Sequence, residues 1–218
     1  GLRAWETPKA SRHARGSHVR NLLKGFRQDE NVVSILPVSR DILAEPDGHF
    51  LMFATAQGKV KKTALEHYVR IFRNGKYAIK LVEGDSLVSV RQQQEGDEVV
   101  LISKRGMACR FYAEEARALG RVSQGVTGMR FKHAGDTVVG MIVTNNSETH
   151  ILTISRQAMG KRTRMGTAEK IPDLDASGVQ KIDKHGDPKQ KTDGYRRTHR
   201  GAKGVQTMAL DSEDSIVS

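Results

Sequence analysis

The stretch Gly58-Lys59-Val60-Lys61-Lys62-Thr63 opens the clearest copy of a motif that returns along the chain. A basic glycine loop around Asn74-Gly75-Lys76 and an acidic turn at Gly84-Asp85 follow it. The same order of parts returns between Gly106 and Asp136. A repeat of about 50 residues is typical of a propeller, a solenoid or another repeat array.

Four copies of the motif can be aligned, and we expect them to form four blade-like repeats of one domain, 1–218. The longest interval between copies contains 170–194, a polar segment rich in Asp, Lys and Gly that we expect to be a flexible insertion. The expected repeats are 1–48, 49–97, 98–147 and 148–218. The aligned loop glycines are Gly16, Gly75, Gly125 and Gly201, and the acidic turn residues are Glu30, Asp85, Asp136 and Asp214.

Each repeat reads as short β-strands. Apolar runs such as His49–Thr55 end at a glycine, after which polar and apolar residues alternate as in a hairpin. A second hairpin at the acidic turn gives about four strands per repeat, the content of a propeller blade. The sequence therefore predicts an all-β disc of about four blades, complete or incomplete. One helical turn is expected, within Ala113–Leu119.

The hairpin glycine differs in one copy. Gly58 and Gly106 hold this position in the second and third repeats, but the last repeat has Ala158. We therefore expect a different turn type there.

Charge indicates the kind of partner. The chain has 218 residues and a net charge of +11, which favours a polyanion such as nucleic acid over a purely solubilising surface. Cys109 is the single cysteine, so no disulfide framework exists within the chain, as is usual in a reducing cytoplasm. No apolar run is long enough for a membrane span, and no signal peptide opens the chain. The chain reads as a fragment of a longer protein, because its first repeat lacks an opening hairpin.

The basic glycine loops are the candidate site. Glycine lets a backbone approach a phosphate closely, while Lys and Arg supply charge. Few aromatic residues flank these charges, so contact with a duplex backbone is favoured over base stacking. A solvated loop and a charged sheet edge are the alternatives for any single residue. The predicted phosphate contacts are Arg12, Arg15, Lys59, Lys61, Arg73, Lys76, Arg121, Lys161, Arg162, Arg164, Arg196, Arg197, Arg200 and Lys203.

Catalytic motifs are absent from the sequence. None of the histidines has metal-ligand spacing with Cys109 or with paired carboxylates, so we expect no metal site and no cofactor in this chain. Cys109 lies in a strand pattern and is expected in the core. The chain is therefore interpreted as a non-catalytic domain.

Several ordered motifs resemble the C-terminal domain found in the A subunits of DNA gyrases, which are bacterial type IIA topoisomerases. Glu6–Gly16 with Asn21-Leu22-Leu23 looks like the second blade of that family. The later blades are matched by Val60–Thr63 with Ala78–Leu81, by Gly125–Arg130, and by Gly160–Thr163 with Lys203-Gly204-Val205.

This resemblance implies a β-pinwheel, a propeller-like disc whose neighbouring blades exchange strands. It also implies a DNA-binding domain that wraps double-stranded DNA around a basic rim and supports ATP-dependent negative supercoiling. The implied partners are double-stranded DNA, the gyrase B subunit and the remainder of the gyrase A subunit, with no membrane. The cleaving tyrosine and the ATP and Mg²⁺ sites would lie elsewhere in the enzyme, which would act on nucleoid DNA in the cytoplasm.

One segment departs from the family pattern. The gyrase-A box reads roughly Gln-basic-Arg-Gly-Gly-Lys-Gly, and its nearest match is Thr198-His199-Arg200-Gly201-Ala202-Lys203-Gly204, interpreted as a degenerate copy. The matching domain of topoisomerase IV, which steers decatenation, therefore stays an alternative. A protein-interaction propeller whose charge serves solubility is another.

Overall fold

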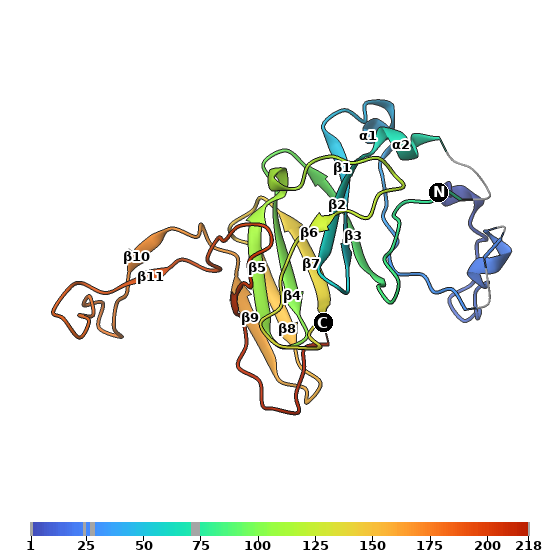
Figure 1. The fold of residues 1–218 in the computed structure, drawn as a ribbon. Helices are drawn as coiled ribbons and strands as arrows, with labels where there is room; N and C mark the ends of the chain where they lie inside the picture. Colours follow the sequence, from blue (N-terminus) through green and yellow to red (C-terminus); the bar gives the residue numbers. More distant parts are fainter. Residues whose placement is uncertain (1, 24, 27–28, 71–74, 218) are drawn as a thin grey trace.

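The computed structural model describes residues 2–23, 25–26, 29–70 and 75–217 (Figure 1). Short strands dominate it, and helices are limited to a few turns. The strands are β1 (His49–Thr55), β2 (Lys59–Ala64), β3 (Leu87–Gln94), β4 (Glu98–Ser103), β5 (Met107–Tyr112), β6 (Val126–Thr127), β7 (Val138–Thr144), β8 (His150–Ile154), β9 (Gly160–Arg164), β10 (Lys170–Pro172), β11 (Gln190–Thr192) and β12 (Val205–Gln206). The helical turns are η1 (Ala4–Glu6), η2 (Val19–Asn21), α1 (Arg40–Ala44), α2 (Glu66–Val69) and η3 (Ala113–Glu115).

Three antiparallel sheets form the body of the fold, and each takes its central hairpin from one repeat (Figure 1). The strand orders are β3-β1-β2-β6, β12-β5-β4-β7 and β8-β9. The edge strands β6 and β12 come from the repeat that follows the hairpin they join. Neighbouring blades thus exchange strands, which confirms the predicted all-β pinwheel class.

In each sheet the acidic turn is joined to the hairpin turn by an equivalent hydrogen bond. The carboxylate of Asp85 accepts the amide of Gln57 at 2.9 Å, and that of Asp136 accepts the amide of Arg105 at 3.0 Å. Asp214 repeats this contact with the amide of Gln157 at 3.2 Å. The three acidic turn residues aligned in the sequence therefore occupy equivalent positions in space.

The predicted change of turn type at Ala158 is wrong. Ala158 has a φ of 64°, close to the values of 79° at Gly58 and 78° at Gly106. Its amide also donates to the carbonyl of Ser155 at 3.0 Å, as the two glycine amides do to the equivalent carbonyls. Only the space differs, because a Cβ at Gly58 would lie 2.5 Å from the carbonyl oxygen of Met129, whereas Ala158 is exposed.

The core lies between the sheets, and β4 separates its two halves. Val99 and Leu101 join the cluster shared with the first sheet, whereas Val100 and Ile102 join the cluster shared with the third. All six residues of β4 are buried, because successive side chains of a strand point to opposite faces and both faces are covered here.

The structure differs from the expectation for residues 1–48. Their described part forms no strand. It contains η1, η2 and α1, and an extended segment that runs alongside β3 in space (Figure 1). The hydroxyl of Ser34 accepts the amide of Val90 at 3.2 Å, and the carbonyl of Pro37 accepts from the Gln92 side chain, which joins this segment to β3. The helical turn expected within Ala113–Leu119 is confirmed by η3.

The segment 170–194 forms an arm that extends away from the sheets (Figure 1). β10 and β11 pair at its base, and beyond them Asp175 and Asp183 each fix a tight turn by accepting two backbone amides. Most of its side chains are exposed. The arm therefore has local order, while its expected flexibility stays a prediction.

Candidate nucleic-acid interface

The outer edges of the three sheets are formed by β6, β12 and β9, on the side away from β3 and β7, which pack together. We call these edges and their flanking loops the rim. In the first sheet Val126 pairs with Val60, and in the second Val205 pairs with Ala108. Two of the basic loops predicted from the sequence, Gly120–Gly125 and Arg196–Gly204, therefore lie on the rim. They belong to the segments 116–125 and 195–204, which we call the crossing loops between neighbouring blades.

The glycines that end the crossing loops allow the chain to pass close to the neighbouring strand, and this is a structural role rather than a phosphate contact. Gly125 and Gly204 have φ values of 82° and 76°, and a Cβ on either would collide with the carbonyl of Val60 or Ala108. Gly204 is thus the equivalent of Gly125, and the alignment of Gly125 with Gly201 is wrong by three residues. Each of these glycines is followed directly by the valine that begins the edge strand, Val126 of β6 or Val205 of β12. This Gly-Val pair is the sequence signal that identifies the correct register.

The same register is marked by backbone bonds. The amide of Leu119 donates to the carbonyl of Lys62 at 2.8 Å, and the amide of Thr198 donates to that of Arg110 at 2.7 Å. Leu119 and Thr198 are six residues before Gly125 and Gly204. Arg121, two residues after Leu119, is therefore the counterpart of Arg200 in the next crossing loop.

Lys61 is buried, contrary to its predicted role as a phosphate contact. Its side chain has 0% exposure, and its ammonium donates to the backbone carbonyls of Ala78 and Arg121. Burial, with the nearby Arg121 charge, lowers its pKa from 10.5 to about 8. The crossing loop covers this residue, so a phosphate cannot reach it in this structure.

The counterparts of Lys61 and Lys62 on β9 face solvent instead. Lys161 and Arg162 are both exposed, and the Lys161 ammonium donates to the carbonyl of Thr207 at 2.7 Å. The difference has a structural cause: β2 and β5 are each covered by a crossing strand, whereas among the described residues β9 pairs only with β8. The charge on this part of the rim is therefore accessible.

Arg110 was not among the predicted site residues, and it anchors the second sheet to the third. The side chain is 2% exposed and forms a buried ion pair with Glu98, whose carboxylate accepts from its Nε at 3.1 Å. Its remaining nitrogens donate to backbone carbonyls of the next repeat. The accepting residues are Met165, Gly166 and Tyr195.

Arg197 and Arg164 are engaged by carboxylates. Arg197 pairs with Glu98 and lies 4.4 Å from the ring centroid of Tyr112. Arg164 pairs with Asp193 and with Glu148, raising the pKa of the guanidinium; the Asp193 pKa is lowered, first by the Thr167 amide and then by Arg164. The pair of Arg164 with Asp193 closes the base of the arm, and both arginines keep part of their surface exposed.

The degenerate box segment presents one cation clearly to solvent. Arg200 is half-buried, and its guanidinium donates to the carbonyls of Glu115 and Thr127 at 2.9 and 2.6 Å. Its amide donates to the Glu115 carboxylate at 2.8 Å. Lys203, in contrast, is exposed. Arg200 therefore holds the crossing loop in place, whereas Lys203 is available to a ligand.

The remaining predicted residues are distributed between exposed and half-buried positions. Lys59 and Lys76 are half-buried. Lys59 donates to the hydroxyl of Thr127 at 3.2 Å, and Lys76 donates to the carbonyl of His67 at 2.8 Å. Arg121 is half-buried on its crossing loop. Arg73 lies outside the described residues. The exposed members are Arg12, Arg15, Lys161, Arg162, Arg196 and Lys203.

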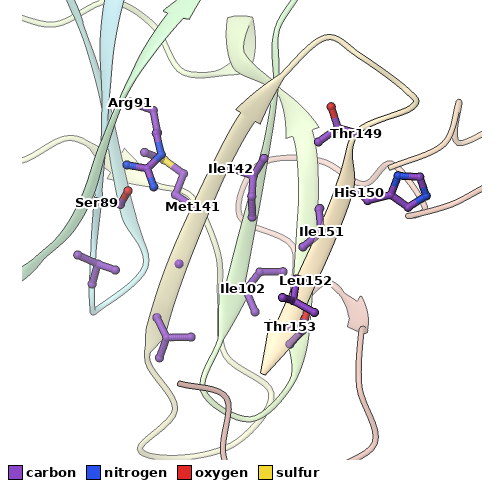
Figure 2. Close-up of a pocket in the computed structure, with 13 residues that line it drawn as sticks. Ser89, Arg91, Ile102, Met141, Ile142, Thr149, His150, Ile151, Leu152 and Thr153 are labelled. Carbon is purple, nitrogen blue, oxygen red and sulfur yellow. The ribbon is translucent and has the colours of Figure 1, made fainter. Parts of the chain in front are cut away.

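A groove of about 310 Å³ lies on the inner side, between β3, β7 and β8 (Figure 2). Ile142, Ile151 and Leu152 line it together with the Arg91 guanidinium, and the His150 ring points away from it. It lies along the edge of β8 that is not paired with β9; at the end of this edge Ser155 forms a bridge with Ile216, and the amide of Val217 donates to the carbonyl of Ile154. Its lining combines these apolar side chains with polar ones, including Ser89, Thr149 and Thr153.

Other kinds of site find no support among the described residues. They contain no group of three or more His, Cys, Asp or Glu side chains suited to a metal ion. Cys109 is buried, and burial raises the pKa of its thiol, which suits a core residue rather than a nucleophile. No described helix has the length and apolar character needed to cross a membrane.

Comparison with known proteins agrees with this architecture. A family model described as "DNA gyrase C-terminal domain, beta-propeller" matches residues 49–94, 97–145 and 189–218, more than half of the chain. The chain belongs to this family. The resemblance seen in the sequence is thereby confirmed, and most of the arm lies outside the matched ranges of the gyrase C-terminal domain.

Curated relatives are DNA gyrase A subunits of bacteria. That of Deinococcus deserti is 32% identical over 98% of this chain, and that of Escherichia coli is 41% identical over 74%. The chain covers 29% and 18% of their lengths, so it corresponds to one part of a gyrase A subunit.

Solved structures share the fold. The C-terminal domain of DNA topoisomerase IV has a TM-score of 0.67 at 21% identity, covering 92% of this chain and 53% of that one. The DNA gyrase A C-terminal domain has a TM-score of 0.58 at 23% identity, covering 100% and 76%. At these identities the likeness concerns the fold alone.

Proposed function

We propose that this gyrase C-terminal domain binds duplex DNA along its rim and bends it around the sheets. In the complete enzyme, with the rest of the A subunit, with the B subunit, and with ATP and Mg²⁺, the bend would support negative supercoiling of nucleoid DNA in the cytoplasm. The observation that carries the proposal is the exposed charge of β9 and the crossing loop beside it, at Lys161, Arg162, Arg196 and Lys203.

The energetics of bending are compatible with such a surface. Bending 20–30 base pairs by 40–90° costs on the order of 1–6 kcal/mol. Each phosphate neutralised by Lys or Arg releases counterions, so several rim contacts can offset this cost at moderate salt. Because contacts to phosphates carry little sequence information, the preference for particular sequences should be weak.

The proposed contacts fall into two groups. The exposed cations named above and Arg12 and Arg15 would meet phosphates directly. The half-buried ones would contribute through the part of each side chain that remains accessible; they are Lys59, Lys76, Arg121, Arg164, Arg197 and Arg200. Arg73 stays a proposal from the sequence, and Lys61 is withdrawn from the contacts because it is buried.

Charge reversal on the rim tests the proposal. The triple variant Arg162→Glu, Arg196→Glu and Lys203→Glu should weaken binding of a 60-base-pair duplex by about 100-fold or more and flatten the salt dependence. The control carries the same charge change on the arm, at the exposed Lys170, Lys184 and Lys191. Equal losses of affinity in both variants would mean that net charge alone drives binding. Unchanged affinity in the rim variant would refute the proposal that DNA binds along the rim.

A further inference from the structure

Lys61 lies where two loops of successive repeats meet. Its ammonium donates one hydrogen bond to the carbonyl of Ala78, in loop 75–82, and one to the carbonyl of Arg121, in loop 116–125. The centroid of the Phe53 ring is 5.5 Å from the same nitrogen. The ammonium is therefore enclosed by acceptors of both loops and by an aromatic face.

The two loops also contact each other directly. The amide of Lys80 donates to the carbonyl of Ser123 at 3.1 Å, which joins the loops a few residues from the Lys61 contacts. Tyr68, on α2, places its hydroxyl 3.4 Å from the carbonyl of Ala78. The position of loop 75–82 thus depends on bonds that converge near one buried ammonium.

The next sheet holds its crossing loop by different chemistry. Cys109 occupies the position of Lys61 there, and its sulfur lies 3.5 Å from the Thr198 hydroxyl and 3.8 Å from the carbonyl of His199. The charged anchor of that loop is Arg200, whose guanidinium donates to the carbonyls of Glu115, at the end of η3, and Thr127, on β6. A buried lysine is therefore not required by the fold at this position, and its presence in the first sheet calls for its own explanation.

We propose that Lys61 is a positioning residue that clamps loop 75–82 to loop 116–125. In doing so it would set the spacing between Lys76 and Arg121, the basic side chains that successive repeats offer to DNA. This inference rests on the proposed function, and it replaces direct phosphate contact as the role of Lys61.

The clamp has a pH signature. The Lys61 pKa of about 8 reflects burial first and the Arg121 charge second. The other titratable groups near it are Lys76, whose pKa is lowered by burial and by Arg121, and Tyr68, whose pKa is raised by burial. Bound phosphates would stabilise the Lys61 ammonium, so DNA binding should take up a proton and weaken as pH rises.

Fold stability should change in the opposite direction. The pKa of Lys61 lies below its ordinary value of 10.5, so between about pH 8 and 10.5 the unfolded chain binds more protons. The free energy of unfolding therefore rises with pH over this window, as far as Lys61 contributes to it. Weaker DNA binding at pH 9 would thus not be a consequence of unfolding.

The test compares the full chain with Lys61→Met, Lys61→Arg and Lys104→Met between pH 7 and 9 at constant ionic strength. If phosphates raise the pKa of Lys61 by about one unit, wild-type affinity for duplex DNA should fall about fivefold over this range. Lys61→Met should bind more weakly at pH 7, and Lys61→Arg should retain binding at pH 9; both should lack the Lys61 part of the pH dependence. Lys104→Met, which removes an exposed charge outside the proposed contacts, should keep the wild-type profile.

Hydrogen exchange provides a second readout without DNA. At pH 7 the protection of the Lys80 amide, which bonds across the loops, should drop about tenfold in Lys61→Met but not in Lys104→Met. If no variant binds DNA, the proposed function fails, while a selective loss at Lys80 would still support the clamp. Wild-type protection together with a wild-type pH profile in Lys61→Met would overturn the inference.

Discussion

Ala158 has a φ of 64°, a left-handed conformation that glycine adopts at the same turn of the other two sheets. A side chain with a Cβ is strained there by about 1–2 kcal/mol, partly offset by the smaller entropy of the unfolded chain. Ala158→Gly should therefore raise the free energy of unfolding by about 0.5–1 kcal/mol, measured by urea denaturation.

The matched change is Gly58→Ala. There the added Cβ would lie 2.5 Å from the carbonyl oxygen of Met129, so the crossing segment would have to move. We expect a loss of about 2–3 kcal/mol. A lower free energy of unfolding in Ala158→Gly would contradict the backbone strain assigned to Ala158. An unchanged free energy of unfolding in Gly58→Ala would contradict the steric clash expected at Gly58.

At the scale of the elements, β2, β5 and β9 are the second strands of the three hairpins. They carry Lys62, Arg110 and Arg162 at the same register position, in different surroundings. Arg110, on β5, is 2% exposed and pairs with Glu98. Replacing one partner of a buried pair leaves the other charge uncompensated, so Arg110→Met should lower the free energy of unfolding by about 3–5 kcal/mol.

The internal control is Arg162→Met, at the equivalent position of β9, where the side chain is exposed. Its effect on the free energy of unfolding should stay within about 0.5 kcal/mol. Denaturant titration of both variants measures the contrast, and equal effects would refute the assigned burial.

Much of this element pattern is local and was predictable. The hairpin glycines Gly58 and Gly106 appear where expected, because their turns depend on local backbone conformation. The acidic turn residues Asp85, Asp136 and Asp214 also appear where expected, and each carboxylate accepts the amide of the next residue. The short helices α1 and α2 were missed, although Ser39 caps α1 by accepting the amide of Ile42 at 3.3 Å.

The fate of the basic side chains was less predictable, because it depends on the next repeat. Lys61 and Lys161 look alike in sequence, but a crossing loop covers the first and not the second. A distant segment also supplies the partners of Arg110, from Met165 to Tyr195. Exposure in a strand-exchanged fold is thus a property of neighbouring repeats, which the local pattern does not contain.

At the scale of the whole molecule, the arm is separable from the sheets. Its base is closed by Arg164 and Asp193, and its large apolar residues Leu174, Val179 and Ile182 are exposed. Replacing 170–192 with two glycines should therefore change the free energy of unfolding by less than about 1 kcal/mol. Denaturation of this deletion variant checks the expectation, and a larger loss would make the arm part of the core.

The distribution of charge over the molecule underlies the central claim. Residues 156–203 carry 13 Lys or Arg against 6 Asp or Glu, and this stretch contains β9, the arm and the second crossing loop. Cations gathered on one edge of the fold can bend DNA toward that edge, and the bend changes the linking number only if the DNA path also rises out of one plane with a single hand.

The most direct measurement is the linking number of plasmid DNA sealed in the presence of the chain. Nicked circular plasmid is incubated with increasing amounts of protein, closed with ligase, deproteinised and resolved by electrophoresis. Chiral wrapping predicts a shift of the topoisomer distribution that grows with protein and has a single sign. A plasmid that is retarded in a gel yet sealed with an unchanged distribution would contradict it.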